Sequence, residues 1–223
     1  MRCDVSRWPP IRLWPRPRTA VTLSSAVVSL AGVARGNAVD VTVADGLSRG
    51  WVTTPPAGLT DLLELRAVAE ARFQAVFHTA PAEWRIEADW SGERAFVCSA
   101  LPVSLLASLH AEAEAQGVVV RSIAPNWVRA LQRLPLREIA GEPLAMACAA
   151  SPEGMAALFL RDGVPIDWRQ HWCEPAEAAQ HLRGQALAAG CELPGQAWVS
   201  GDRATLSALV QSNATMRWKV VPS

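Results

Sequence analysis

Apolar and polar residues alternate along several short stretches of the chain, as they do in strands that bury one face. In the clearest stretch, Trp84, Ile86 and Trp90 alternate with charged residues. Because successive side chains of a strand point to opposite faces, this stretch predicts one buried face and one solvated face. The turn Ser91–Glu93 then leads back into an apolar run, Ala95–Ala100, and so predicts a β-hairpin.

The region after this hairpin predicts the order strand, helix, strand, helix. Pro102 suits the first position of a helix, where its missing N–H is not needed. Gly117 stands where a left-handed C-terminal cap is expected. The β-branched run Val118–Ile123 favours a strand, and Pro125 suits the start of the second helix. This order is typical of an α/β fold, in which helices cover a sheet.

Ahead of this region, the pattern predicts four strands and one long helix. The strands are expected at Thr19–Leu23, Ala26–Ala34, Val39–Ala44 and Arg49–Thr53. Short turns at Ser24-Ser25 and Gly36-Asn37 predict that the first three form an antiparallel meander. The helix is expected over about Asp61–Phe77, with Thr60 as its N-cap.

After residue 135 the same plan repeats. Strands are expected at Leu144–Ala150, Met155–Leu160, Val164–Arg169, Ala197–Ser200 and Met216–Val221. The turns Ser151–Gly154 and Arg161–Gly163 join the first three as a second meander. Helices are expected over Pro175–Ala189 and after Gly201 or Asp202. The repeat predicts a first lobe over 19–135, with an inserted α/β subdomain, and a second lobe over 136–223.

The amino-terminal segment allows two interpretations. Residues 1–18 are rich in arginine and proline, which predicts a disordered tail. A basic start before the apolar run 19–34 also resembles a secretory signal or membrane anchor. Serine and threonine residues interrupt that run, and it is short for a bilayer span, so strands are the favoured interpretation.

Composition narrows the function classes. The formal net charge is zero, so the chain lacks the excess of positive charge that is typical of nucleic-acid-binding proteins. The five cysteines are scattered and form no C-x-x-C pair, which favours a reduced, cytoplasmic setting.

Two catalytic or metal constellations can be assembled on paper, and both are weak. The set Cys148, His171, Cys173 and His181 lacks the ligand spacing of structural zinc sites. The set Ser99, Ser104 and His110 lacks the G-x-S-x-G turn that positions a hydrolase nucleophile. We therefore expect neither a metal site nor a hydrolase triad.

Two duplicated lobes, each opening with a meander, resemble the actin-like ATPase fold, a duplicated ribonuclease H-like fold. Within this fold, the sequence more closely resembles the PilM-like proteins of type IV pilus assembly and the related cytoplasmic domain of the type II secretion L protein. Three stretches carry the resemblance: Val41–Phe73, Phe96–Leu131, and Ala145–Trp168 followed by Val199–Gly201. The resemblance implies a two-lobed α/β fold, reduced in size because the chain is short for this family.

The resemblance also locates the loops that would hold a nucleotide. Family members that use ATP have an acidic, glycine-containing turn between the first two strands, which binds phosphate and Mg²⁺. This chain has Ser24 and Ser25 there instead. The equivalent turn of the second lobe contains Ser151 and Gly154, and the glycine pair on the adenosine side is reduced to Gly201 and Asp202. Pro152 lacks an N–H donor, and Asp202 repels phosphate, so a vestigial site without cofactor or metal is expected.

Two functions follow from the resemblance. The first is a non-catalytic scaffold in assembly of a type IV pilus-like or type II secretion-like machine. Its implied partner is the cytoplasmic segment of an inner-membrane pilus or secretion protein, which places the chain in the cytoplasm at the inner face of the bacterial inner membrane. Peripheral membrane association through the basic tail stays open. The alternative is an active ATPase that binds ATP and Mg²⁺ through unorthodox loops.

Overall fold

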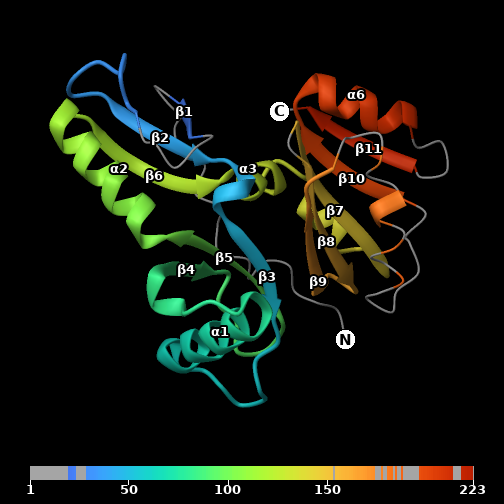
Figure 1. Cartoon of the computed structure of the whole chain (residues 1–223). Helices are drawn as coiled ribbons and strands as arrows, with labels where there is room; N and C mark the ends of the chain where they lie inside the picture. The colour runs from blue at the N-terminus through green and yellow to red at the C-terminus, as the bar shows by residue number, and fades with distance from the viewer. Residues whose placement is uncertain are drawn as a thin grey trace.

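The structure is a computed structural model that describes residues 20–23, 29–152, 154–173, 177, 180–182, 184, 187, 196–212 and 217–222. These residues form three β-sheets, of three, three and five strands (Figure 1). The two smaller sheets come from the first part of the chain and the five-stranded sheet from the second. The predicted tail, residues 1–18, lies outside the described residues.

The first sheet has the order β1-β2-β6, with β1 at Ala20–Leu23, β2 at Ala38–Val43 and β6 at Val119–Pro125. Both pairs are parallel. Helix α2, Val103–Gln116, packs on this sheet through Leu105 and Leu109. Its C-cap Gly117 has φ +65°, as the sequence predicted.

The predicted antiparallel meander of the first lobe is wrong. Its second strand was expected at Ala26–Ala34, but residues 29–34 contain a turn at 31–32 and no strand, and residues 24–28 lie outside the described part. Gly32 and Gly36 adopt positive φ values of +88° and +81°, which an extended strand does not permit. The chain therefore crosses over between β1 and β2, and the two strands run parallel.

The second sheet is antiparallel in the order β3-β5-β4. Its strands are β3 Arg49–Thr53, β5 Phe96–Pro102 and β4 Trp84–Ala88, with a 3-10 turn, η3 Pro81–Glu83, before β4. Helix α1, Leu62–Phe77, covers it and buries Phe73 against Trp51. The N-cap of α1 is Asp61 and not Thr60, because the Asp61 carboxylate accepts the Leu63 N–H at 2.6 Å.

The predicted alternation in β4 is confirmed. Ile86 is buried, and Trp84 and Trp90 are partly buried against the same core. Trp84 packs on Phe73 with ring centroids 5.5 Å apart, and Trp90 packs on Phe96 at 5.7 Å. The charged residues between them face outward, so the period-2 pattern identified the buried face correctly.

The third sheet has the order β11-β10-β7-β8-β9. Its strands are β7 Leu144–Ser151, β8 Gly154–Arg161, β9 Val164–His171, β10 Gln196–Gly201 and β11 Arg217–Pro222. The first three form the predicted antiparallel meander, and β10 and β11 add in parallel. The described strands of residues 144–222 therefore form one mixed sheet, antiparallel at one end and parallel at the other.

Helices cover both faces of this sheet. Helix α6, Arg203–Ser212, packs on one face through Leu206 and Leu209. The short helices α3, Asn126–Leu131, and α4, Leu136–Ile139, pack on the other. In the predicted helix Pro175–Ala189, the described residues 180–182, 184 and 187 are helical.

The second and third sheets meet where β3 packs against β9. Gly50 of β3 makes this approach close, because a Cβ atom there would lie 2.4 Å from the indole nitrogen of Trp168. Val52 of β3 and Val97 of β5 also pack into the core that holds Trp168. A shared apolar core therefore joins the two parts of the chain.

Candidate functional site

A groove of about 330 Å³ lies between the first and second sheets. One wall is α2 with β6, and the other is β4 with β5. Its lining residues are Arg85, Glu87, Ser99, Leu101, Leu106, His110, Val120, Arg121, Ser122, Ile123 and Pro125. Apolar and polar side chains mix along these walls, which suits an amphipathic segment better than a small apolar ligand.

The groove runs beside a strand edge. Among the described strands, β6 is the last of its sheet, and β4 is the last of the second sheet. The outer edge of β6 therefore presents backbone N–H and C=O groups with no strand partner on that side. An extended peptide can hydrogen-bond to such an edge while neighbouring pockets read its side chains.

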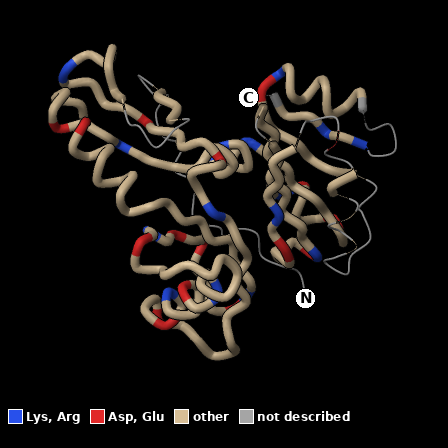
Figure 2. The backbone as a smooth tube through the Cα atoms, viewed as in Figure 1, with Lys and Arg blue, Asp and Glu red and all other residues tan. Residues whose placement is uncertain are grey.

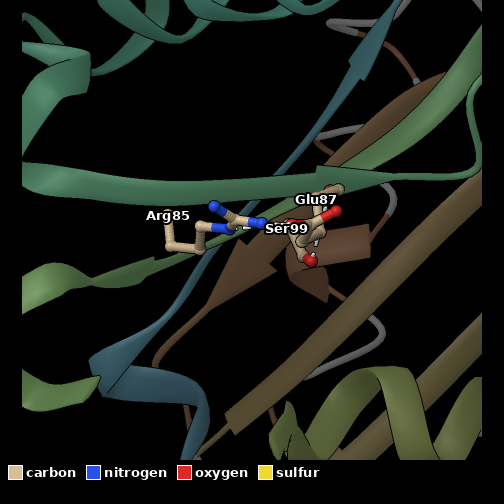
Figure 3. Close-up of polar contacts among 3 residues, drawn as sticks. All are labelled: Arg85, Glu87 and Ser99. Atoms are coloured by element: carbon tan, nitrogen blue, oxygen red, sulfur yellow. Dashed lines mark hydrogen bonds and ion pairs between the residues drawn. The ribbon is translucent and has the colours of Figure 1, made fainter. Parts of the chain in front are cut away.

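The β4–β5 wall carries an ordered polar cluster (Figure 3). The Arg85 guanidinium donates from Nε to Glu87 Oε1 at 2.8 Å, and its Nη2 lies 2.8 Å from the same oxygen. Ser99 of β5 donates from Oγ to the backbone carbonyl of Glu87 at 3.4 Å. Both charged side chains are more than half exposed, so they are available to a ligand in the groove.

The opposite wall is held in place by hydrogen bonds of Ser122, a residue of β6 that lines the groove. The Ser122 hydroxyl donates to the Asp40 carboxylate of β2 and accepts from the Arg129 guanidinium of α3. The register of β6 is therefore fixed on its inner side, while its outer side faces the groove.

The nucleotide positions implied by the resemblance come together only in part. Ser151, Gly154, Gly201 and Asp202 gather at one end of the five-stranded sheet, since Ser151 pairs with Gly154 and Gly201 pairs with Ala150. Ser24 and Ser25 lie outside the described residues.

The two glycines are needed for packing. A Cβ atom at Gly154 would lie 2.0 Å from the carbonyl oxygen of His171, and one at Gly201 would lie 2.3 Å from that of Ala150. Close contacts between strands therefore explain why glycine is needed at both positions, without any role in binding phosphate.

Asp202 caps helix α6. Its carboxylate accepts the backbone N–H groups of Ala204 at 3.1 Å and Thr205 at 3.0 Å, and the Thr205 hydroxyl. Slight burial would raise the pKa of Asp202, but these hydrogen bonds lower it below its ordinary value. The carboxylate is thus ionised and hydrogen-bonded to the first turn of α6, as in an N-cap.

The two other constellations do not assemble. His171 and His181 stack with ring centroids 5.3 Å apart. Burial lowers the pKa of His171, and electrostatic interactions with His181 and with Arg169 lower it further. No group of three or more metal-ligating side chains forms among the described residues. Ser99 and His110 line the same groove, but the Ser99 hydroxyl donates to the Glu87 carbonyl.

Sequence reasoning missed Asp45, a buried carboxylate in the 3-10 turn Asp45–Leu47. It accepts the backbone N–H of Trp127 at 2.9 Å and the Asn126 amide at 3.4 Å. Its carbonyl accepts the Gln170 amide of β9 at 2.8 Å. Asp45 thus links three elements, and the only local signal was an Asp-Gly pair after an alternating strand.

No family model matches the chain, and no curated protein does. Solved structures do match. The type IV pilus biogenesis complex PilM–PilN contains a chain with TM-score 0.60 and 13% identity, over 84% of this chain and 70% of that one. The cytoplasmic domain of EpsL, an inner-membrane component of the Vibrio cholerae type II secretion system, gives TM-score 0.52 and 13% identity, over 85% and 71%.

A third match is a Bacteroides thetaiotaomicron protein of unknown function with an actin-like ATPase fold, at TM-score 0.49 and 8% identity over 82% of this chain and 68% of that one. The resemblance and the fold class predicted from the sequence are confirmed: the chain has a reduced actin-like α/β fold, similar to those of PilM and the EpsL cytoplasmic domain.

Proposed function

We propose that this protein is a non-catalytic scaffold in assembly of a pilus-like or secretion-like machine, and that it binds a cytoplasmic segment of an inner-membrane protein. The observation that supports this most directly is the groove beside the unpaired edge of β6. The matched PilM chain comes from a complex with a second protein, and EpsL is an inner-membrane component, so both neighbours work in assemblies.

The groove suits an extended segment. Backbone groups on the outer edge of β6 supply hydrogen bonds that do not depend on sequence. Leu101, Leu106 and Ile123 offer apolar contacts, while Arg85 and Glu87 offer charges of both signs. Such a surface selects a peptide by the order of its apolar and polar residues.

The scaffold role also rests on the nucleotide positions. Asp202 is used as a helix cap, and the glycines at 154 and 201 are used for strand packing. A carboxylate at this end of the sheet repels a polyphosphate unless a metal compensates for it. We therefore infer that the protein does not hydrolyse ATP. The experiment described below also tests the alternative that it is an active ATPase.

The partner places the chain at the inner face of the membrane. No helix among the described residues is long and apolar enough to cross a bilayer. We infer that the chain acts in the cytoplasm and reaches the membrane through its partner, with peripheral association through the basic residues 1–18 as a second contact.

The test is calorimetric titration of the full chain with the cytoplasmic peptide of the membrane protein encoded beside it, and with ATP and Mg²⁺. Ser99→Trp fills the groove and should abolish peptide binding. Ser104→Trp is the matched control, because Ser104 is exposed on α2 and does not line the groove. Peptide binding with no ATP signal supports the scaffold. Micromolar ATP binding with steady hydrolysis contradicts it and favours the ATPase.

A further inference from the structure

A second strand edge lies at the other end of the molecule. Among the described strands, β11 is the last of the five-stranded sheet and pairs only with β10. Its residues Arg217, Lys219 and Val220 are exposed. In Figure 2, blue segments of the backbone tube mark Lys and Arg positions along this last described strand. Within the described part of the chain, the outer side of β11 therefore has no strand partner, as an acceptor for one more strand requires.

The two faces of β11 differ in chemistry. Arg217 and Lys219 share one face, because they are two residues apart, and Trp218 and Val220 share the other. Trp218 packs against the core under α6, and Val220 is 42% exposed beside it. A strand paired with β11 would meet cations on one face and an apolar surface on the other.

The cationic face continues into a hollow of about 400 Å³ at the amino-terminal ends of β7, β10 and β11. Its lining residues are Glu142, Leu144, Gln196, Trp198 and Arg217. Lys219 pairs with Trp198 in the strand register, and its ammonium lies 4.8 Å from the indole centroid. Trp198 is 1% exposed, yet its indole N–H has no hydrogen-bond partner.

Several buried polar atoms of the described residues lack a partner, but among those residues Trp198 alone lines this hollow, where an acceptor from another molecule would approach it. Two cations and an indole N–H on one face together favour a carboxylate. Glu142 on the opposite side of the hollow disfavours a larger polyanion, because it would repel the added charge. The site thus fits single acidic side chains.

We propose that the outer edge of β11 binds an extended acidic segment of a second partner protein, in which acidic residues alternate with apolar ones. The acidic side chains lie on the face of Arg217 and Lys219, and the apolar side chains lie against Trp218 and Val220. The same cations exclude neutral or basic strands, since unpaired charges on an edge oppose pairing. The proposed scaffold would then hold two partners at two separate strand edges.

The test uses a fluorescently labelled peptide of about eight alternating Glu and Val residues, enough to span a strand of this length. Fluorescence anisotropy with the full chain should show binding that weakens as salt is raised. A peptide with Lys in place of Glu should not bind. The double variant Arg217→Glu/Lys219→Glu should weaken binding of the acidic peptide by roughly tenfold or more and gain binding of the Lys peptide.

The matched control is Arg72→Glu/Arg203→Glu, which makes the same change in net charge at exposed sites on α1 and α6. It should keep acidic-peptide binding. Equal binding to both double variants, or no binding to the wild type, overturns the proposal. A dimer in sedimentation that is lost in Arg217→Glu/Lys219→Glu also overturns it, because the edge would then bind a second copy. Binding of the membrane-protein peptide in the groove is measured separately with the Ser99→Trp variant. The groove proposal and the β11 proposal can therefore fail independently of each other.

Discussion

The carboxylate of Asp45 accepts the backbone N–H of Trp127 at 2.9 Å, although the two residues are 82 positions apart in the chain. The Trp127 indole in turn donates to the Ser48 hydroxyl at 3.2 Å, and that hydroxyl donates to the Asp45 carbonyl at 3.1 Å. The 3-10 turn between β2 and β3, which contains Asp45, is thus hydrogen-bonded to the start of α3. Helix α3 in turn packs on the five-stranded sheet.

We expect Asp45→Ala to lower the free energy of unfolding by about 3 kcal/mol, because it leaves buried N–H donors without an acceptor. Urea unfolding followed by circular dichroism measures this. Asp61→Ala is the control: it removes an exposed cap of α1 and should lower the free energy by only about 1 kcal/mol. Equal losses in the two variants would show that the Asp45 network adds nothing beyond an ordinary helix cap.

Gly154→Ala and Gly201→Ala should each destabilise the fold by about 1–3 kcal/mol, because the new methyl group would overlap a backbone carbonyl oxygen. Thermal unfolding measures the change. Gly184→Ala provides the comparison, since a Cβ atom there meets nothing within 4 Å and the residue is helical. That variant should be neutral or slightly more stable. If the first two variants keep wild-type stability, the packing explanation for these glycines is wrong.

Local sequence patterns predicted most of the helices and strands. They did not predict how strands that are far apart in the sequence pair with one another. The meander β7-β8-β9 was predictable because the Arg161–Gly163 turn joins adjacent strands, and Asp162 and Gly163 adopt the positive φ values that such a turn needs. The parallel pairing of β2 with β6 joins residues about 80 positions apart, and no turn encodes it.

The candidate site illustrates the same limit. Ser99 and His110 appeared in the sequence only as members of a rejected triad, yet both line the groove between the sheets. That groove depends on how two sheets meet, which hydrophobic periodicity does not determine. Asp45 was missed for the same reason, since its partners Trp127 and Gln170 lie on distant elements.

Replacing Phe73 with alanine should lower the free energy of unfolding by about 3–5 kcal/mol, because the ring is fully buried among Trp51, Phe77 and Trp84. Trp90→Ala should have a smaller effect, about 1–3 kcal/mol, since Trp90 is only partly buried. Urea unfolding of both variants decides this. A loss in Trp90→Ala as large as that in Phe73→Ala would contradict the partial burial of Trp90.

Stability should fall as the pH rises above about 9 because of two buried thiols. Burial raises the pKa of Cys98 to about 12, although its contact with Thr53 opposes this, and burial raises the pKa of Cys148 as well. In the unfolded chain both thiols ionise near 9.0. The unfolded state therefore loses protons first, and each thiol removes about 1.4 kcal/mol of stability per pH unit above that value.

The check is the urea midpoint between neutral pH and pH about 10, compared in the wild type and in Cys98→Ala, since an alanine cannot ionise. The variant is less stable at neutral pH because of the lost packing, but its stability should fall less steeply with pH. Parallel curves for the two proteins would show that the Cys98 thiol ionises as readily in the folded state as in the unfolded one.

The ion pair between Arg85 and Glu87 should matter for recognition and not for folding. Its side chains are 61% and 51% exposed, and exposed pairs typically contribute less than about 1 kcal/mol. In a double-mutant cycle of Arg85→Ala and Glu87→Ala, we expect a coupling free energy below about 0.5 kcal/mol in urea unfolding.

Both side chains line the groove, so the same variants should weaken binding of the membrane-protein peptide severalfold, with a stronger effect at low salt. The control is Arg72→Ala on α1, which lies outside the groove lining and should leave both quantities unchanged. Unchanged peptide affinity in both groove variants would show that the charged end of the groove does not contact the partner.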